Sequence, residues 1–141
     1  MNLDFAVACD YALIDRFGKL SVMGIFQHVW VTNFPAVHPR LHLVLKIKGK
    51  RTELGSHNIE INFTDSGDAV LLKVSGTVTL NEPPAGILEI EAGAILVFDI
   101  PLPHEGQYRF EISVDNQLDT VVPLTASQRI GPVDVEGTQL H

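Results

Sequence analysis

The chain has 141 residues and a formal net charge of −7 at pH 7, and 45% of its residues are hydrophobic and 19% charged. This length suits one domain with a sizeable core, and the composition argues against disorder. The negative charge disfavours nucleic acid and anionic lipid as partners, because both are polyanions.

The cysteine content and the first residues bear on the compartment. Cys9 is the only cysteine, so the chain cannot form an internal disulfide and needs no oxidising environment. The first ten residues include Asp4 and Asp10 and lack a basic leader, so we expect no signal peptide. No stretch reaches the roughly 18 apolar residues of a membrane span. These features predict a cytoplasmic protein that does not bind membranes.

Hydrophobic and polar residues alternate at the start of the chain. Residues 3–9 predict a first strand in which Cys9 points inward. Residues 15–19 predict a turn in which Gly18 takes the positive φ that hairpin turns require. The run over 20–34 is hydrophobic at both odd and even positions, and a bulge at Gly24 would reconcile its two halves.

Further alternating runs follow, separated by turn residues. Pro35 and Pro39 predict a loop over 33–39, and strands are predicted over 40–48, 57–65 and 70–80. Residues 87–100 indicate either two short strands or one long bulged strand. Strands over 107–115 and 118–125 come next, joined by a turn at Asn116 and Gln117, and residues 126–141 predict a flexible tail.

These runs together predict the fold class. Period-two alternation puts one set of side chains on one face of each strand, and no window shows the sustained 3.6-residue period of a long helix. We therefore expect an all-β protein: a single antiparallel two-sheet sandwich of about eight strands over residues 1–125, with an interior of packed hydrocarbon.

Residues that could carry catalysis or hold a metal are scattered. No serine lies in a Gly-x-Ser-x-Gly turn, and Cys9 has the parity of a core residue. The histidines do not have the short spacings of a zinc site: His28, His38, His42, His57, His104 and His141. We predict that the protein is not an enzyme and uses no metal or cofactor.

Three lysines of one predicted strand share a parity. Lys46, Lys48 and Lys50 would form a basic row on its outer face. The row could dock an acidic partner or a phosphate. The alternative is a solvated strand whose lysines discourage pairing between sheet edges.

Trp30 is the main candidate for an interaction residue. If Gly24 sets the phase of its run, Trp30 faces outward beside Phe34, and so large an exposed aromatic suggests an interface with a protein partner or a second copy. The alternative is that Trp30 plugs one end of the core.

Two other functions remain open at this point. Aspartates in the predicted loops, such as Asp65 and Asp68, could bind calcium, although aspartate is also a favoured turn residue. A small enzyme with a cavity between the sheets would need convergent polar groups in that cavity.

The segment from Glu105 to Ile112 contains Gly106-Gln107-Tyr108-Arg109-Phe110, which resembles the Gly-x-Tyr-x-(Cys or Phe) step of immunoglobulin-like sandwiches. The resemblance implies a structural role for Gly106 and Tyr108, with the tyrosine hydroxyl capping the backbone at a sheet corner. The cysteine pair and the tryptophan of antibody domains are absent from this pattern.

A second resemblance covers most of the chain to about residue 125. Its sharpest part is Gly18-Lys19-Leu20, followed by Gly24 and Phe26, and it extends to residues 106–114 and to Pro123-Leu124. The pattern resembles a family of small, mostly bacterial β-sandwich proteins classed as a domain of unknown function. It implies a fold and architectural roles for Gly18 and Gly24, but no chemistry. We therefore predict a non-enzymatic binding or assembly module.

Overall fold

The computed structural model describes residues 1–129, which form an all-β structure with one short 3-10 turn, η1, over Arg51–Glu53. The described part contains nine strands: β1 (Asn2–Ile14), β2 (Leu20–Ile25), β3 (His28–Val31), β4 (Ala36–Lys50), β5 (Gly55–Asp65), β6 (Val70–Leu80), β7 (Glu89–Leu102), β8 (Gly106–Val114) and β9 (Gln117–Gln128). No helix of the described part is long and apolar enough to cross a membrane.

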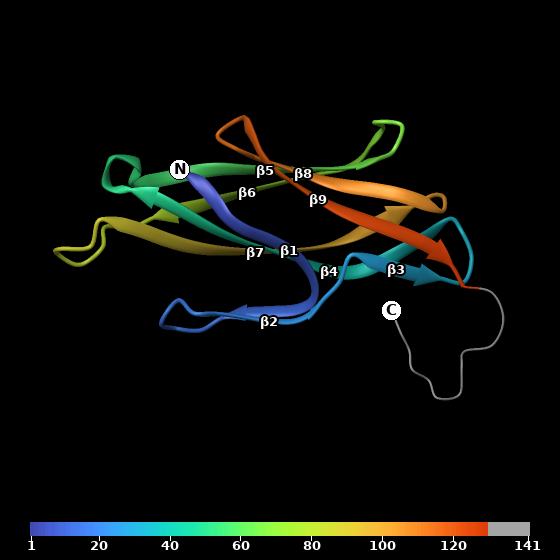
Figure 1. Ribbon diagram of the computed structural model, residues 1–141, viewed down its shortest axis with the longest axis horizontal. Coiled ribbons are helices and arrows are strands. Elements are labelled where there is room, and N and C mark those ends of the chain that lie inside the picture. The colour runs from blue at the N-terminus through green and yellow to red at the C-terminus, as the bar shows by residue number, and fades with distance from the viewer. Residues whose placement is uncertain (130–141) are drawn as a thin grey trace.

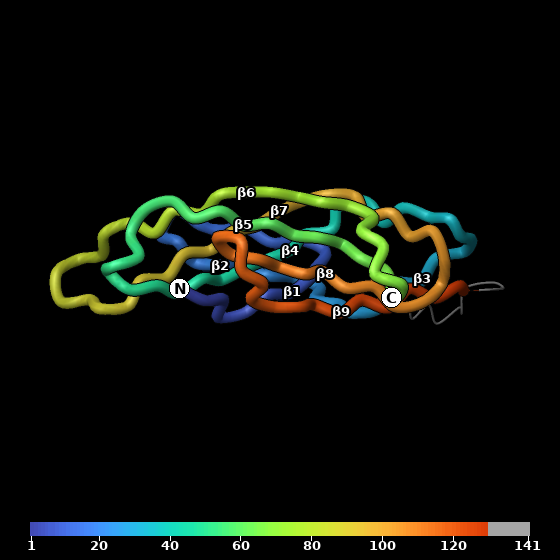
Figure 2. The backbone as a smooth tube through the Cα atoms, turned by 90° about the horizontal axis from the view of Figure 1, so that it is seen from above, coloured from blue at the N-terminus to red at the C-terminus, as the bar shows by residue number. Residues whose placement is uncertain are grey.

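The strands form two sheets that lie one above the other in a sandwich-like arrangement (Figure 1). Sheet A has four strands in the order β2-β1-β4-β7. Sheet B has five, in the order β3-β9-β8-β5-β6, and curls into a half-barrel. Figure 2 looks onto sheet B, with β6, β5, β8 and β9 following one another across an elongated molecule.

The main core lies between the sheets and follows the alternation in the sequence. Leu41, Leu43, Leu45 and Ile47 project from β4 and are fully buried. They belong to the same cluster as inward residues of β5 and β8, which include Ile59, Ile61, Phe63, Phe110 and Ile112. The predicted all-β, two-sheet fold is therefore confirmed, and its hydrophobic interior is a single cluster shared by both sheets.

A second, smaller core lies on the outer face of sheet A. The C-terminal half of β1 and the whole of β2 form a hairpin that leaves the layer of β4 and β7 (Figure 1). Its residues Ala12, Leu20 and Val22 pack against Cys9 and Val44. Cys9 is buried as predicted, but in this second cluster rather than between the sheets.

Several predicted boundaries need correction. The loop predicted over 33–39 is shorter, because β4 already begins at Ala36. Pro39 fits within the strand because the register between β4 and β7 shifts between His38 and Leu41, where Arg40 has a φ of 52°. A proline is tolerated at such an irregularity, where no ladder hydrogen bond needs its missing N–H.

The sequence predicted purely antiparallel pairing, and this is wrong for one pair, because β3 runs parallel to β9. The stretch over 87–100 contributes one long strand, β7. The last turn lies one residue earlier than predicted, with positive φ at Asp115 and Asn116. Strand β9 runs to Gln128 rather than residue 125, and residues 130–141 of the expected tail lie outside the described residues.

Candidate interaction groove

A groove of about 500 Å³ lies where β1, β2, β3 and β4 approach one another. A volume of this size is typical of sites that hold a small molecule or a few side chains of a peptide. Its lining combines aromatic, ionisable and backbone surfaces: Asp10, Gly24, Ile25, Phe26, His28, Val29, Trp30 and His38.

Gly24 shapes the floor of the groove. It has a φ of +70°, and a Cβ at this position would overlap the carboxylate of Asp10. The hydrogen-bonding pattern between β1 and β2 changes near Gly24. At the turn, the odd-numbered residues bond, since Asp15 N–H donates to the Lys19 carbonyl (3.0 Å), whereas beyond Gly24 Phe26 N–H donates to the Ala8 carbonyl (3.0 Å). The predicted bulge is not found, because the register between β1 and β2 is continuous past Gly24, with Tyr11 opposite Met23 and Cys9 opposite Ile25. The positive φ of Gly24 and its missing Cβ let the Asp10 side chain lie against the backbone.

Trp30 projects from β3 and is 42% exposed, so it does not plug the core. Its ring stacks on that of His28, with centroids 4.1 Å apart and planes 10° apart. His28 is held in turn by a hydrogen bond of 2.8 Å between its Nε2 and the Ser127 hydroxyl of β9. The predicted neighbour Phe34 is partly buried against the main core and is not part of the groove lining. The indole is therefore fixed in position at the surface.

The lining also includes His38, whose ring centroid lies 5.4 Å from that of Phe26. Burial lowers the pKa of His38, an effect that the charge of Asp10 partly offsets. The imidazole is therefore neutral near pH 7. The groove thus offers one carboxylate beside aromatic surfaces, which suits a cationic group next to an apolar one.

The predicted basic row lies on the outer face of sheet A, away from the groove. Lys46 is 3.3 Å from Glu91, and Lys48 is 3.6 Å from both Asp4 and Glu89. These carboxylates, Asp4 first, raise the pKa of Lys48. Lys50 is exposed at the end of β4. The charges of Lys46 and Lys48 are compensated within the sheet, so these two lysines do not present an unbalanced positive surface.

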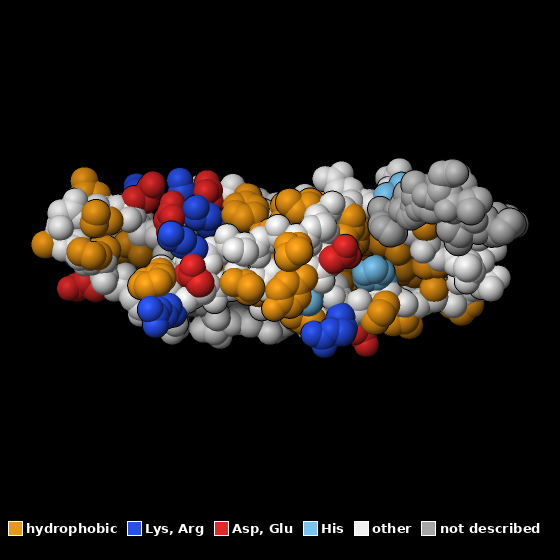
Figure 3. Space-filling model, turned by 90° about the horizontal axis from the view of Figure 1, so that it is seen from below, with side chains coloured by type: hydrophobic (Ala, Val, Ile, Leu, Met, Phe, Trp, Pro, Cys, Tyr) orange, Lys and Arg blue, Asp and Glu red, His pale blue; other side chains and the backbone are white. Residues whose placement is uncertain are grey.

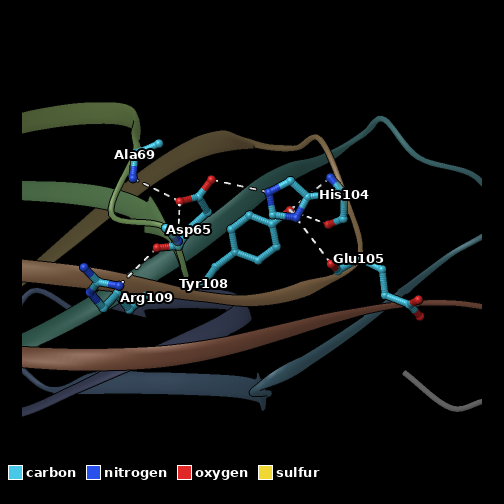
Figure 4. A network of polar contacts seen from close by, with 7 residues as sticks. Asp65, Ala69, His104, Glu105, Tyr108 and Arg109 are labelled. Carbon is cyan, nitrogen blue, oxygen red and sulfur yellow. Dashed lines mark hydrogen bonds and ion pairs between the residues drawn. The ribbon is translucent and has the colours of Figure 1, made fainter.

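Tyr108 has the structural role that its motif implied. Its hydroxyl donates a hydrogen bond to the carbonyl of His104 and accepts one from the His104 N–H at 3.2 Å (Figure 4). Gly106 lies between them with a φ of +143°, and Gly18 has a φ of +85° in its turn. These residues shape the backbone at turns and do not line the groove.

The aspartates of the loops are engaged by their own chain. Asp65 Oδ1 accepts hydrogen bonds from the N–H groups of Gly67 (2.9 Å) and Ala69 (3.0 Å), and Asp65 Oδ2 lies 3.3 Å from His104 Nε2 (Figure 4). The bond from Ala69 is the main cause that lowers the pKa of Asp65. Within residues 1–129, no group of three or more His, Cys, Asp or Glu side chains is placed to hold a metal ion.

Sequence reasoning identified Trp30 but missed its companions in the groove. It treated His28 and His38 as isolated histidines and gave Asp10 no role in a site, because their proximity depends on how β1, β3 and β4 are arranged. One signal was available: Gly24 and Phe26, two residues of the motif near the N-terminus, both line the groove.

Comparison with protein families matches residues 4–127 to a family described as "Family of unknown function (DUF6941)". Comparison with curated proteins finds no match.

Proposed function

The chain belongs to DUF6941, a family of unknown function, and from that premise we propose, on structural grounds, a non-enzymatic interaction module that binds a protein partner through the groove. The observation that carries the proposal is Trp30, which is 42% exposed yet held by stacking on His28. A rigid, accessible tryptophan is typical of the residues that dominate binding energies at protein interfaces.

A preformed groove loses less conformational entropy on binding than a flexible loop would. Ordering a side chain on association costs about 0.5–1.5 kcal/mol, and this cost is reduced where the side chain is already held in place. The His28–Ser127 hydrogen bond and the His28–Trp30 stack hold the indole before a partner arrives. The partner is recognised by its apolar surface and by geometry, with Asp10 setting a preference for a positive charge.

The groove chemistry defines the expected ligand segment. Asp10 is the carboxylate of the lining, and His38 is neutral near pH 7 because burial lowers its pKa. A lysine or arginine would pair with Asp10, and an adjacent aromatic or aliphatic residue would cover Trp30. We propose a short segment of a protein that combines these two features, rather than a nucleic acid or a membrane.

We also propose that the arrangement of sheets is of the immunoglobulin-like sandwich type and that the protein works in the cytoplasm. The Tyr108–His104 contact supports the first proposal, since it resembles the tyrosine corner of such sandwiches. The single, buried Cys9 supports the second. Calcium binding and catalysis in a cavity between the sheets have no comparable observation in their favour within residues 1–129.

Selection from a library of random displayed peptides tests the function. We expect enriched peptides to share a basic residue next to an aromatic or aliphatic one, and Trp30→Ala to weaken their binding by at least about tenfold. Leu118→Ala is the matched control, because Leu118 is 62% exposed at the far end of β9 from Ser127. The proposal fails if no shared pattern emerges, or if Trp30→Ala folds normally and binds the peptides as the parent does.

A further inference from the structure

Strand β2 is an edge of sheet A, and its composition is unusual for an edge. Its sequence, Leu20 to Ile25, contains no charged residue and no proline. Exposed edge strands are normally very short or contain charged residues or prolines, because an unprotected edge pairs with other strands. An uncharged edge of six residues therefore indicates a strand that pairs with another chain.

The other edges of the described sheets have such protection. Strand β7 carries Glu89, Glu91, Asp99 and Pro101, and β6 carries Lys73. Strand β3 is only four residues long. Among the edges in residues 1–129, β2 alone combines length with the absence of charge.

The backbone of β2 has hydrogen-bonding groups directed away from β1. Asp15 and Lys19 form a hydrogen-bonded pair, and in an antiparallel ladder such pairs recur every second residue. Ser21 and Met23 therefore bond to β1, opposite Leu13 and Tyr11. Leu20 and Val22, between them, direct their N–H and C=O groups toward the free edge.

Large hydrophobic side chains accompany this free edge. Tyr11, Leu13 and Met23 lie on one side of the β1–β2 hairpin by register, and together with Ile25 at the end of β2 they are 41–64% exposed. We call these four residues the hairpin face. Figure 3, which looks at the molecule from the side of β2, shows hydrophobic side chains at this surface beside groups of charged ones. Several large apolar side chains exposed beside one sheet edge are typical of an interface.

We propose that β2 pairs antiparallel with β2 of a second copy of the chain, across a two-fold axis, so that the two four-stranded sheets join. This inference goes beyond the proposed function, because it concerns the free edge of β2 and not the groove that this strand flanks. Antiparallel pairing of one strand with itself is self-complementary, as a two-fold interface requires.

Charge opposes a second copy less at this edge than over most of the surface. The protein has a net charge of −7, so two copies repel each other over most of their surfaces. The hairpin over residues 11–25 is the exception, with Arg16 and Lys19 against the single acidic residue Asp15. Strand β2 itself brings no like charges together when it meets its own copy.

Sedimentation of the full chain over a wide range of concentration tests the proposal. We expect a monomer–dimer equilibrium that Met23→Lys weakens by at least about tenfold, because two lysines then meet across the axis. The control is Leu118→Lys, which adds the same charge at a side chain of similar exposure, 62% against 64% for Met23, and leaves dimerisation unchanged.

A backbone variant separates strand pairing from other contacts of the hairpin face. Val22→Pro removes an N–H that is directed to the free edge and spares the hydrogen bonds between β1 and β2. It should weaken the dimer at least as much as Met23→Lys, while circular dichroism and thermal melting show a folded protein. The hairpin variant Met23→Ala, which shortens the side chain and keeps every N–H, should weaken the dimer less.

Three results would overturn the proposal: a monomer at every concentration, a dimer that Met23→Lys and Leu118→Lys affect equally, and a dimer that folded Val22→Pro forms as well as the parent. Each leaves the peptide selection with Trp30→Ala unaffected. A protein that selects peptides through Trp30 but stays monomeric refutes the β2 pairing alone, whereas a dimer that selects no peptide refutes the groove.

Discussion

Tyr108 connects β8 to the preceding loop through one hydroxyl group with two roles. The hydroxyl donates to the His104 carbonyl and accepts from the His104 N–H, while the ring stacks on Phe63 in the main core with centroids 5.2 Å apart. The buried ring thus fixes the position of a surface turn. The same turn brings His104 to within 3.3 Å of Asp65, so the loops after β5 and β7 are joined at this corner.

Removal of this hydroxyl should lower stability. Tyr108→Phe keeps the ring but leaves two backbone groups of His104 without their partner, so we expect a loss of about 1–2 kcal/mol in the free energy of unfolding. Urea denaturation measures the effect. Tyr11→Phe is the control, because Tyr11 is 49% exposed and should change stability by less than about 0.5 kcal/mol. Equal effects of the two substitutions would refute the structural role.

His57 links three segments, and its contribution to stability should depend on pH. Its Nδ1 lies 2.6 Å from Asp115 Oδ2 in the β8–β9 turn, and its Nε2 lies 2.6 Å from the carbonyl of Glu53 in η1. The bond to Asp115 is the main cause that raises the pKa of His57 and, equally, the main cause that lowers the pKa of Asp115.

The way in which stability depends on pH follows from the directions of the two pKa shifts. A raised histidine pKa stabilises the fold fully below the unfolded value, about 6.5, and the effect is lost as the pH rises through the folded pKa. A lowered aspartate pKa stabilises the fold above the unfolded value, about 3.9, and the effect is lost as the pH falls through the folded pKa. His57→Gln should therefore cost most stability between about pH 4.5 and 6.5 and less above about pH 8. Denaturation over this pH range measures it, and a cost independent of pH would contradict the assignment.

At the scale of elements, the β1–β2 hairpin determines both the groove and the free edge. Gly24, the last residue but one of β2, has a conformation that disfavours a side chain. Phe26, just after the strand, packs against the main core, whereas Leu20 and Val22 of β2 pack against the second core on β4. The turn at its other end is held by Asp15, whose Oδ1 accepts from the N–H groups of Phe17 (2.8 Å) and Lys19 (3.0 Å).

Two glycine substitutions distinguish backbone strain from the contact with Asp10. Both Gly18 and Gly24 have positive φ, but an added Cβ at Gly18 meets no atom within 4 Å. Gly18→Ala should therefore cost about 1 kcal/mol from strain alone. Gly24→Ala should cost more and should also weaken peptide binding in the groove, because the Asp10 carboxylate must move. Thermal unfolding and peptide affinity check this prediction, and equal results at the two positions would contradict it.

Strand positions were predictable from the sequence where alternation was regular, and the groove was not. Parity correctly assigned the buried residues of β4 and β5, such as Leu43 and Ile61. Parity states which side of a strand is buried but not which strand lies beside it. The parallel pair β3–β9 and the approach of Asp10 to His38 depend on the second kind of information. The glycine motif indicated an irregular backbone but not the groove that this irregularity forms.

At the scale of the whole molecule, two cores of different size stabilise different parts of the structure. The main core joins both sheets, whereas the second core holds only the β1–β2 hairpin against β4 and β7. Leu43 and Val44 are adjacent in β4, both fully buried, and belong to different cores. The smaller core should therefore open first, without unfolding of the sheets.

Truncation of these two neighbours separates local opening from global unfolding. Leu43→Ala should lower the free energy of unfolding by about 2–5 kcal/mol. Val44→Ala should cost less but should accelerate labelling of Cys9 by a thiol reagent under native conditions, because Cys9 is buried in the same cluster. Labelling requires opening because Cys9 is fully buried, and burial also raises the pKa of its thiol, which lowers its reactivity. Labelling that follows global stability in both variants would contradict independent opening of the hairpin.

The position of Trp30 has a practical consequence for spectroscopy. It is the only tryptophan of the chain, so fluorescence excited at the red edge of its absorption comes from the groove alone and carries no signal from the interior. Emission should respond when a ligand displaces water from the indole or disturbs its stacking on His28. The protein therefore contains its own optical probe of occupancy.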